Sequence, residues 1–320
     1  MKAAVLRSIG RSPGFEEFAE PRPQEGEVLV QVLAASLKPI DKQLANGTHY
    51  ASPRNLPVIC GTDGVGRLAD GTRVFFGGPR RPYGSMAPRT VVPRAFCFPI
   101  PEGVSDESAA ALINPGVSAW LSLSHKTKIA QGETVLILGA TGIAGRLAVQ
   151  IAKLLGAGRV IASGRNEQAL NALLSLGADI LVPLGSSDEE VKDAFHQAAG
   201  DQGFDVIIDY LWGRPTELLL SAMTRTEFAR FIKQTRLLQV GETAGPAISL
   251  PAAALRSIPL VISGTGGIPP QNVLVDAVQQ VFNLAAQGKL AVNTEQVSLA
   301  DIESAWQWET ESGLRLVIVP

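Results

Sequence analysis

The spacing of hydrophobic residues changes near residue 130. Before that point, apolar and polar residues alternate over residues 27–33, as in a half-buried strand, and residues 71–77 contain a second predicted strand. Proline and glycine interrupt this region often, and helical spacing is convincing only over residues 106–113. The pattern predicts a first domain that is rich in strands and turns.

After residue 130, apolar strands alternate with amphipathic helices. Residues 134–138 form a continuous apolar run, typical of a strand covered on both faces, and apolar residues recur every three or four positions over residues 143–155. Further strands are predicted at residues 159–163, 180–182, 204–209, 236–240 and 259–263, with helices at 167–176 and 187–199. This alternation predicts βαβ units and a parallel sheet.

The segment after about residue 266 is too short to fold alone. It contains a predicted helix over residues 273–286, a short segment at 302–309 and a strand over 314–319. We therefore expect it to return to the first domain. The expected organisation is an α/β domain of residues 118–266 inserted into a β-rich domain of residues 1–117 and 267–320.

A glycine-rich turn lies between the first buried strand and its helix. Its glycines are Gly139, Gly142 and Gly145, a GxxGxxG spacing. Glycines here permit a tight turn and a close approach of a pyrophosphate, and the helix N-terminus supplies N–H donors. An ordinary strand–helix turn is the alternative, but strand, glycines, helix and second strand follow in order within about 30 residues. We predict a dinucleotide site.

The end of the second strand bears on which dinucleotide binds. NAD sites usually carry Asp or Glu there, to bind the ribose 2′-hydroxyl. This chain has Gly164, followed by Arg165, whose guanidinium suits a 2′-phosphate. Ser163 and Asn166 offer further hydrogen bonds, although Asn166 also suits a helix N-cap and Arg165 a solvated helix start. The pattern favours NADP(H).

Composition and charge exclude several classes of protein. The 320 residues are 46% hydrophobic, which excludes a disordered chain, and 28 basic against 30 acidic residues argue against a nucleic acid or an anionic membrane as main partner. No apolar run reaches the roughly 20 residues of a membrane span, and no cleavage signal is evident at the N-terminus. Two cysteines give no disulfide framework. We expect a cytoplasmic protein.

Several segments share their order and spacing with a known superfamily. They are residues 38–41, 56–66, 83–87, 109–112, 117–120, 139–145 and 314–319. Taken together, the chain resembles the medium-chain dehydrogenase/reductase superfamily, in its zinc-free quinone oxidoreductase branch. The resemblance implies a Rossmann domain, a doubly wound parallel sheet, inserted into a GroES-like substrate domain.

The zinc ligands of that superfamily are replaced here. Lys38 stands where the first ligand cysteine would fall, Thr62 and Asp63 replace a His-Glu pair, and the four cysteines of the structural zinc lobe are missing. We expect no metal, with Cys60 and Cys97 as buried apolar fillers. No tyrosine has a lysine four residues later, which excludes the Tyr-xxx-Lys chemistry of short-chain reductases.

A carbonyl substrate can accept a hydride without zinc or a tyrosine–lysine pair if it is conjugated, because the negative charge then spreads onto a distant oxygen. We therefore expect an NADPH-dependent, zinc-independent oxidoreductase that reduces a small-molecule quinone or another α,β-unsaturated carbonyl. One alternative is a catalytically idle NADPH-binding sensor or scaffold. A zinc alcohol dehydrogenase is the other, and it would require bound metal.

The resemblance implies an acceptor cleft between the domains, roofed by residues 36–41 and Tyr50. Tyr50 is the predicted holder of the acceptor oxygen, or else a partly buried core aromatic. Lys38 is predicted to stabilise an oxyanion, or else to be a surface lysine. Asp41 is either an acid or a structural hydrogen-bond acceptor, and His49 either a proton shuttle or an exposed loop residue.

The resemblance also implies a set of cofactor contacts. Ser118 is expected near the pyrophosphate or the nicotinamide, and Gly142 and Ile143 at the pyrophosphate. Residues 240–242 and 263–265 are expected near the nicotinamide, residues 210–212 beside the adenine, and Arg315 near a phosphate. The family dimerises through the strand at 259–263, so a homodimer is expected. The full predicted cofactor set is Ser118, Thr141, Gly142, Ile143, Ser163, Arg165, Asn166, Tyr210, Val240, Gly241, Gly264 and Arg315.

Overall fold

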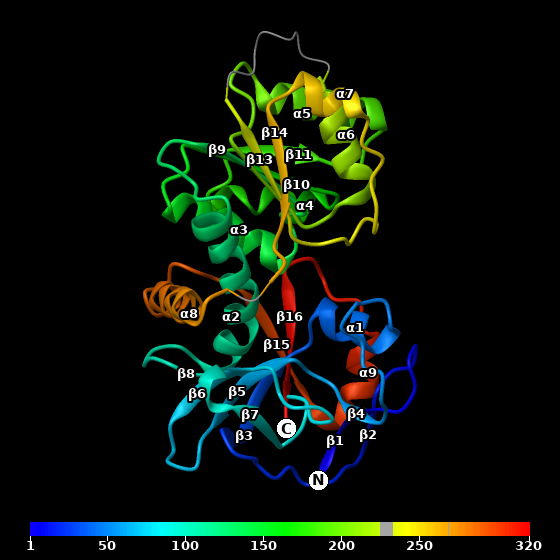
Figure 1. Ribbon diagram of the computed structural model, residues 1–320, viewed down its shortest axis with the longest axis vertical. Coiled ribbons are helices and arrows are strands. Elements are labelled where there is room, and N and C mark those ends of the chain that lie inside the picture. The colour runs from blue at the N-terminus through cyan, green and yellow to red at the C-terminus, as the bar shows by residue number, and fades with distance from the viewer. Residues whose placement is uncertain (225–232, 268) are drawn as a thin grey trace. The chain divides into compact units, whose positions relative to one another are not determined.

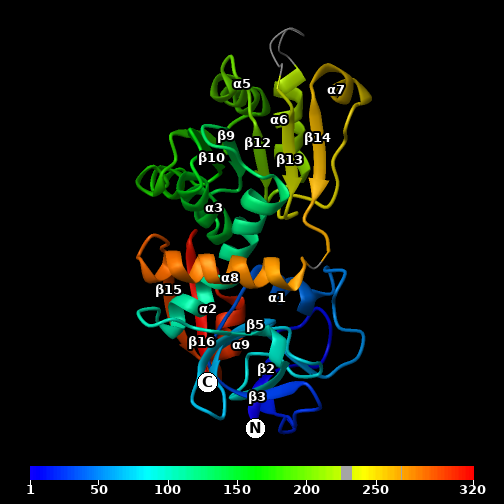
Figure 2. The same ribbon diagram turned by 60° about the vertical axis from the view of Figure 1, so that its left-hand side comes forward.

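The computed structural model describes residues 1–224, 233–267 and 269–320. It contains two compact units (Figures 1 and 2): the first is Met1–Asn114 with Val278–Pro320, and the second is Pro115–Ala277. The division expected from the sequence, after residues 117 and 266, lies three residues beyond Asn114 and eleven before Ala277.

The first unit is built mainly from antiparallel strands. Its larger sheet has the order β15-β16-β3-β5-β6-β8, and β7 pairs with β3 as well. The strands are β3 (Glu27–Ser36), β5 (Asp63–Arg67), β6 (Arg73–Gly77), β7 (Arg89–Pro93), β8 (Cys97–Pro99), β15 (Asn293–Ser298) and β16 (Leu314–Val319). The C-terminal strand β16 pairs with β3, with Val317 opposite Ser36, and so completes the sheet of the N-terminal segment.

A second, smaller sheet and several helices complete this unit. The sheet has the order β2-β1-β4, with β1 (Lys2–Leu6), β2 (Gly14–Glu17) and β4 (Val58–Ile59). Its core packs Leu6 and Val58 against Trp306 of the C-terminal segment. The helices are α1 (Pro39–Asn46), α2 (Asp106–Trp120), α8 (Gln271–Ala286) and α9 (Ile302–Gln307), of which α2 and α8 cross the unit boundaries.

The second unit contains a six-stranded parallel sheet, as predicted. Its order is β11-β10-β9-β12-β13-β14, the doubly wound Rossmann arrangement. The strands are β9 (Thr134–Leu138), β10 (Arg159–Gly164), β11 (Ile180–Pro183), β12 (Val206–Asp209), β13 (Thr235–Gln239) and β14 (Leu260–Gly264). The helices are α3 (Ile143–Leu154), α4 (Glu167–Asn171), α5 (Asp188–Ala199), α6 (Gly213–Thr224) and α7 (Ala252–Ser257).

Several predicted elements differ from those in the structure. Strand β3 continues three residues past residue 33, because a β-bulge between Val32 and Ala34 breaks the alternation there. Helix α2 runs through Pro115 to Trp120, since burial of its alanines outweighs one lost hydrogen bond. Helix α6 was not predicted, because its consecutive buried leucines hide a helical period.

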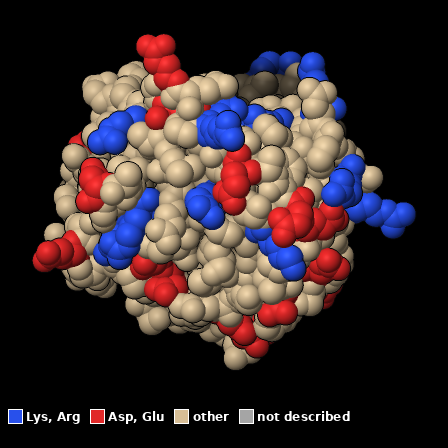
Figure 3. Space-filling view, turned by 90° about the horizontal axis from the view of Figure 1, so that it is seen from below, with Lys and Arg blue, Asp and Glu red and all other residues tan. Residues whose placement is uncertain are grey.

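The charged surface in Figure 3 is mixed in sign. Lys and Arg side chains lie next to Asp and Glu side chains, and uncharged areas separate these groups. Exposed ion pairs of the first unit include Arg7 with Glu16 at 2.6 Å and Arg89 with Glu20 at 3.3 Å. Such pairs contribute little to stability, which therefore rests on the cores. Among the described helices, none combines the length and hydrophobicity needed to cross a bilayer.

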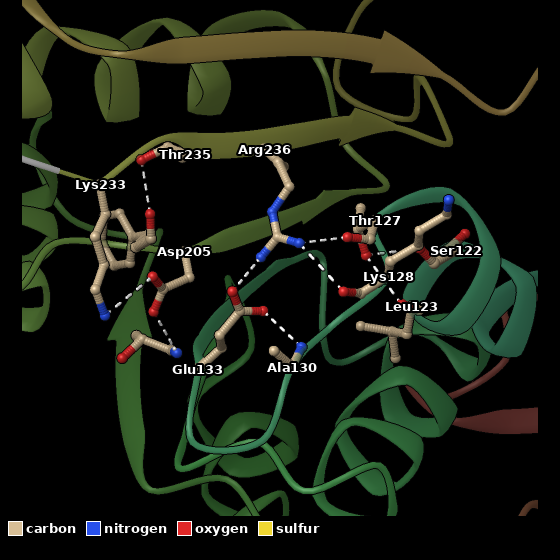
Figure 4. Close-up of polar contacts among 12 residues, drawn as sticks. Ser122, Leu123, Thr127, Lys128, Ala130, Glu133, Asp205, Lys233, Thr235 and Arg236 are labelled. Carbon is tan, nitrogen blue, oxygen red and sulfur yellow. Dashed lines mark hydrogen bonds and ion pairs between the residues drawn. The ribbon is translucent and has the colours of Figure 1, made fainter.

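Arg236 connects β13 to the loop that precedes β9 in the Rossmann sheet (Figure 4). From β13, its guanidinium donates to the carbonyl oxygens of Thr127 and Lys128 and pairs with Glu133. Glu133 in turn accepts the N–H of Ala130 at 2.8 Å. These contacts fix the loop that leads into β9, at the edge of the sheet opposite the glycine-rich turn.

Replacing Arg236 by alanine should destabilise the second unit. Three acceptors, two of them main-chain oxygens, lose their donor, so we expect a loss of about 2 kcal/mol and a fall of roughly 4–8 °C in the melting temperature of this unit. Arg214→Ala is the matched control, because that side chain makes ion pairs with Asp188 and Glu217 in exposed positions. Thermal unfolding followed by circular dichroism measures both; an equal, small effect of the two variants contradicts the prediction.

Candidate functional site

Each glycine of the turn between β9 and α3 has its own structural reason. Gly139 adopts φ of +80°, which favours glycine. A Cβ on Gly145 would lie 2.3 Å from the carbonyl oxygen of Gly139, so α3 packs directly on the turn. A Cβ on Gly142 would meet no atom closer than 3.7 Å, which leaves that side of the turn open. A tight turn, close packing and an open approach are the three properties of a pyrophosphate loop.

The first turn of α3 supplies donors to this loop. Gly142 is the N-cap, and the first hydrogen bond within the helix joins the N–H of Arg146 to the Gly142 oxygen at 2.8 Å. The N–H groups of residues 143–145 therefore have no partner within the helix and lie at the positive end of its dipole. The predicted residues Thr141, Gly142 and Ile143 come together here, in an arrangement that fits a dinucleotide.

The Thr141 side chain occupies the space that a side chain at position 164, the end of β10, would need. A Cβ on Gly164 would lie 2.5 Å from the methyl carbon and 3.1 Å from the hydroxyl oxygen of Thr141. The position where NAD sites carry a carboxylate is thus filled by a β-branched neighbour. The absence of an acid here follows from packing as well as from charge.

The neighbouring polar residues at this strand end are largely committed elsewhere. Ser163 is buried, and its hydroxyl donates to the Ile137 oxygen at 3.2 Å. Asn166 is the N-cap of α4, since its Oδ1 accepts the Ala169 N–H at 2.9 Å. Arg165 is exposed and makes no ion pair among the described residues. Of the three predicted 2′-phosphate ligands, Ser163 has its hydroxyl proton committed, whereas the Arg165 guanidinium and the Nδ2 group of Asn166 can still donate.

Asp209, which the sequence reasoning missed, organises the next strand end. Its Oδ1 accepts the N–H groups of Leu211 and Trp212 at 2.8 and 2.9 Å, and its Oδ2 accepts the Thr216 hydroxyl at 2.6 Å. Burial raises the pKa of Asp209, and these donors oppose that rise. An acid as the last residue of a buried strand was the sequence signal for this residue.

The ends of β12 and β13 lie close together around Asp209. The N–H groups of Val240 and Gly241 donate to its main-chain oxygen at 2.8 and 3.1 Å, and a Cβ on Gly241 would lie 2.7 Å from the Tyr210 oxygen. The Tyr210 hydroxyl is buried and has no hydrogen-bond partner among the described residues, and burial raises its pKa. Tyr210, Val240 and Gly241 thus meet at the carboxyl edge of the sheet, where such folds bind ligands.

A buried charged cluster occupies the first unit. Lys38 is only 3% exposed, and its Nζ lies 3.2 Å from Asp41 Oδ2, 3.2 Å from Asp63 Oδ1 and 3.1 Å from the Ser36 oxygen. The alternative that Lys38 is a surface lysine is therefore wrong, because two buried carboxylates compensate its charge. Arg315 of β16 adds a second buried cation and donates to the Leu37 oxygen at 2.8 Å.

Local structure explains how these side chains meet. Lys38 is the N-cap of α1, and its N–H donates to Asp41 Oδ2 at 2.9 Å. Asp63 begins β5, and its Oδ2 accepts the Thr62 hydroxyl and the Asn114 amide, both at 3.0 Å. Asp63 and Asn114 were not among the predicted site residues. The signal that could have identified these two residues was a polar side chain within an otherwise buried element.

The carboxylates keep Lys38 protonated. Burial alone would lower the pKa of Lys38, but Asp41 and Asp63 raise it above its ordinary value. Burial raises the pKa of Asp63 against the opposing effect of Lys38, and it lowers the pKa of Arg315 against the effect of both carboxylates. Two cations and two carboxylates thus offset one another among buried residues.

This donor set does not fit zinc. The positions of the three expected ligands hold an ammonium, a hydroxyl and one carboxylate, and an ammonium already lies between the carboxylates. Across residues 1–224, 233–267 and 269–320, no group of three His, Cys, Asp or Glu side chains is arranged to hold a metal ion.

A pocket of about 250 Å³ borders the cluster. Asp41 and Thr62 line it together with Arg81, whose Nη2 donates to the Ala51 oxygen at 2.6 Å. The apolar part of its lining comprises Leu6, Leu44, Ala45, Pro53, Val58, Ile59 and Cys60. The first unit thus offers an apolar space with a polar end.

Tyr50 lies apart from this space. Its side chain is 98% exposed and contacts the ring of His49, with ring centroids 4.1 Å apart. The alternative that Tyr50 is a partly buried core aromatic is therefore wrong, and its predicted contact with an acceptor stays a prediction. Among the cofactor set, Ser118 lies on α2 and Gly264 ends β14, whereas Arg315 belongs to the charged cluster of the first unit.

The cysteines are unreactive fillers. Cys60 is buried as predicted, whereas Cys97 is half-buried. Burial raises the pKa of the Cys60 thiol well above its ordinary range and that of Cys97 to about 11. Both remain thiols at neutral pH, which suits neither metal binding nor nucleophilic attack.

Known proteins resemble this chain in sequence and structure. Residues 144–226 match a family described as zinc-binding dehydrogenase. The quinone oxidoreductase of Sus scrofa is 31% identical over 209 residues, which span 61% of this chain and 60% of that protein. The probable NADPH-dependent quinone reductase tdiC of Emericella nidulans is 27% identical over 353 residues, 96% of each chain. The quinone oxidoreductase of Thermus thermophilus, solved also in complex with NADPH, is 26% identical and covers the whole of both chains with a TM-score of 0.81.

Replacing Lys38 by methionine should destabilise the first unit by about 3–5 kcal/mol, because two buried carboxylates lose their cation. Burial already raises the pKa of Asp63, and without the ammonium that pKa should rise further. A carboxyl group whose pKa is raised in the folded protein lowers the free energy of unfolding at pH values above that raised pKa, and has no such effect below the ordinary carboxyl pKa. The stability deficit of the variant should therefore shrink as pH falls from 8 to 5. Wild-type Lys38, with its raised pKa, stabilises throughout this range.

Thermal unfolding at both pH values measures this effect. The matched control is Lys42→Met on the same helix, where burial lowers the lysine pKa and no ion pair is lost. A Lys38 variant as stable as this control, or a deficit that does not change with pH, contradicts the prediction.

Proposed function

Because the chain belongs to the medium-chain dehydrogenase/reductase superfamily, in its quinone oxidoreductase branch, we propose that it transfers a hydride from NADPH to a quinone or another α,β-unsaturated carbonyl without zinc. The observation that carries the proposal is the glycine-rich turn of the Rossmann unit, where Thr141 excludes an acid from position 164 beside Arg165.

The second unit is assigned to the cofactor. The open side of Gly142 and the free N–H groups at the start of α3 would hold the pyrophosphate, and Arg165 the 2′-phosphate. Tyr210, Val240 and Gly241 would lie along the rest of the dinucleotide. When bound, NADPH supplies the hydride, and the chain supplies orientation and a site from which water is excluded.

The first unit is assigned to the acceptor. Its pocket offers apolar walls for a ring or conjugated chain, with the Arg81 guanidinium as a hydrogen-bond donor for an oxygen. A conjugated acceptor spreads the incoming negative charge onto a distant oxygen, so a strong electrophile is not required. This is consistent with a site that lacks zinc ligands.

Lys38 is assigned to positioning. An ammonium has three N–H donors, and Asp41, Asp63 and the Ser36 oxygen lie within 3.2 Å of its Nζ. Its donors are therefore committed within the protein. Lys38 holds Asp41 and Asp63 in place, and through them the Thr62 hydroxyl that hydrogen-bonds to Asp63.

The proposal extends to compartment and assembly. Cys60 and Cys97 are both free thiols, which suits the reducing cytoplasm. Strand β14 ends the order of the six-stranded sheet, and Val261 on it is exposed. An exposed edge strand of this kind supports a homodimer formed by two copies of β14.

Turnover with a panel of acceptors tests the proposed reaction. We expect oxidation of NADPH, followed at 340 nm, in the presence of 1,4-benzoquinone, a naphthoquinone or a simple enal, at rates unchanged by a zinc chelator. Tight NADPH binding without oxidation would favour an idle sensor or scaffold instead. Activity lost on chelation and restored by zinc would identify a zinc alcohol dehydrogenase.

Arg165→Ala tests the choice of cofactor. Loss of charge-assisted hydrogen bonds to a 2′-phosphate should raise the KM for NADPH roughly 10- to 100-fold and leave the KM for NADH nearly unchanged. Steady-state kinetics with both cofactors measure this. Arg256→Ala, an exposed arginine of the same unit, is the control. Unchanged NADPH kinetics in the Arg165 variant would remove the assignment.

A further inference from the structure

The glycine-rich turn lies directly against the end of β10. The N–H of Ala140 donates to the Ser163 oxygen at 2.8 Å, and the Thr141 side chain fills the space beside Gly164. Under the proposed function, this strand end faces the ribose that carries the 2′-phosphate. A side chain held by Thr141 therefore lies near the strand end at which the 2′-phosphate would bind.

Arg146 is such a side chain. It lies in the first turn of α3, where its own N–H bonds to the Gly142 oxygen, and its Nε donates to the Thr141 oxygen at 3.2 Å. The guanidinium thus folds back from the helix onto the turn. Thr141 contacts Gly164 with its side chain and holds Arg146 with its carbonyl oxygen.

The position of Arg146 is electrostatically unfavourable. A cation in the first turn of a helix lies at the positive end of the helix dipole. Arg146 is half-buried, burial lowers its pKa, and among the described residues its side chain has no carboxylate partner. By contrast, the partly buried Arg236 pairs with Glu133, and Arg159 binds two carbonyl oxygens at the end of α5, where the dipole favours a cation.

A bound anion would remove that cost. We infer that Arg146 is a second 2′-phosphate ligand, placed opposite Arg165, and that it sets the preference for NADPH over NADH. The inference rests on the proposed function of the second unit. A phosphate dianion between two guanidinium groups would receive charge-assisted hydrogen bonds from both sides and would offset the charge that the helix start now bears alone.

Binding of cofactor fragments tests this role apart from catalysis. Isothermal titration of the full chain with 2′,5′-ADP and with 5′-AMP, which differ in the 2′-phosphate, gives the discrimination directly. Arg146→Gln should weaken 2′,5′-ADP binding about 10-fold and leave 5′-AMP binding unchanged, and Arg146→Lys should restore part of the loss. The ratio of kcat/KM for NADPH to that for NADH should fall by the same factor.

Stability provides a second readout that a merely structural arginine would not give. Without ligand, Arg146→Gln should have a melting temperature equal to or above that of the wild type, because it removes a cation from the helix start. The control is Lys153→Gln in the last turn of the same helix, where the lysine pairs with Asp179 at 2.6 Å. This control should lose stability and keep its preference for 2′,5′-ADP.

The outcomes separate the two proposals. A wild type that binds 2′,5′-ADP no better than 5′-AMP overturns both the NADPH assignment and the role of Arg146. A wild type that discriminates, with an Arg146→Gln variant that discriminates equally well, overturns the role of Arg146 alone. So does a variant that loses affinity for both ligands to the same extent.

Discussion

The first unit depends on the compensation of buried charge around Lys38. Its ammonium lies 3.2 Å from each of two buried carboxylates, and Arg315 arrives from the last strand of the chain. Each charge would be costly alone, so α1, β5 and β16 must be in place together. This requirement joins the N-terminal segment to the C-terminal strand and fixes one end of the pocket where Asp41 and Thr62 lie.

The second unit depends on a different constraint, which is the close approach of main-chain segments. Gly145 lets α3 rest on the turn, Gly139 provides the left-handed conformation, and Gly142 leaves one side open. Thr141 then fills the space beside Gly164, so a single β-branched residue excludes the acid that NAD sites use. The packing of Thr141 on Gly164 thus supports the proposed choice of NADPH, to which the proposed arginine ligands would add charge.

The family relation and the site chemistry diverge at one point. The matching family is described by zinc binding, yet this chain places an ammonium, a hydroxyl and a carboxylate at the ligand positions. The cation at this place is the Lys38 ammonium, which lies between Asp41 and Asp63. A lysine whose donors are committed cannot polarise an acceptor as zinc does, which supports the proposed preference for acceptors that need only a hydride.

Sequence alone determined the elements whose signals are local. The apolar runs that became β9 and β16, and the glycine-rich turn, were predicted with their observed bounds, because periodicity and turn chemistry depend on near neighbours. The burial of Lys38, the contact of Thr141 with Gly164, the role of Asp209 and the exposure of Tyr50 came only from the tertiary structure. The surroundings of Lys38 depend on distant partners, since Arg315 reaches Leu37 across 278 residues. The partners of the Asp209 side chain are local, at most 7 residues away, but the turn that brings them together left no pattern in the sequence. No local pattern records which distant charge or backbone a residue will meet.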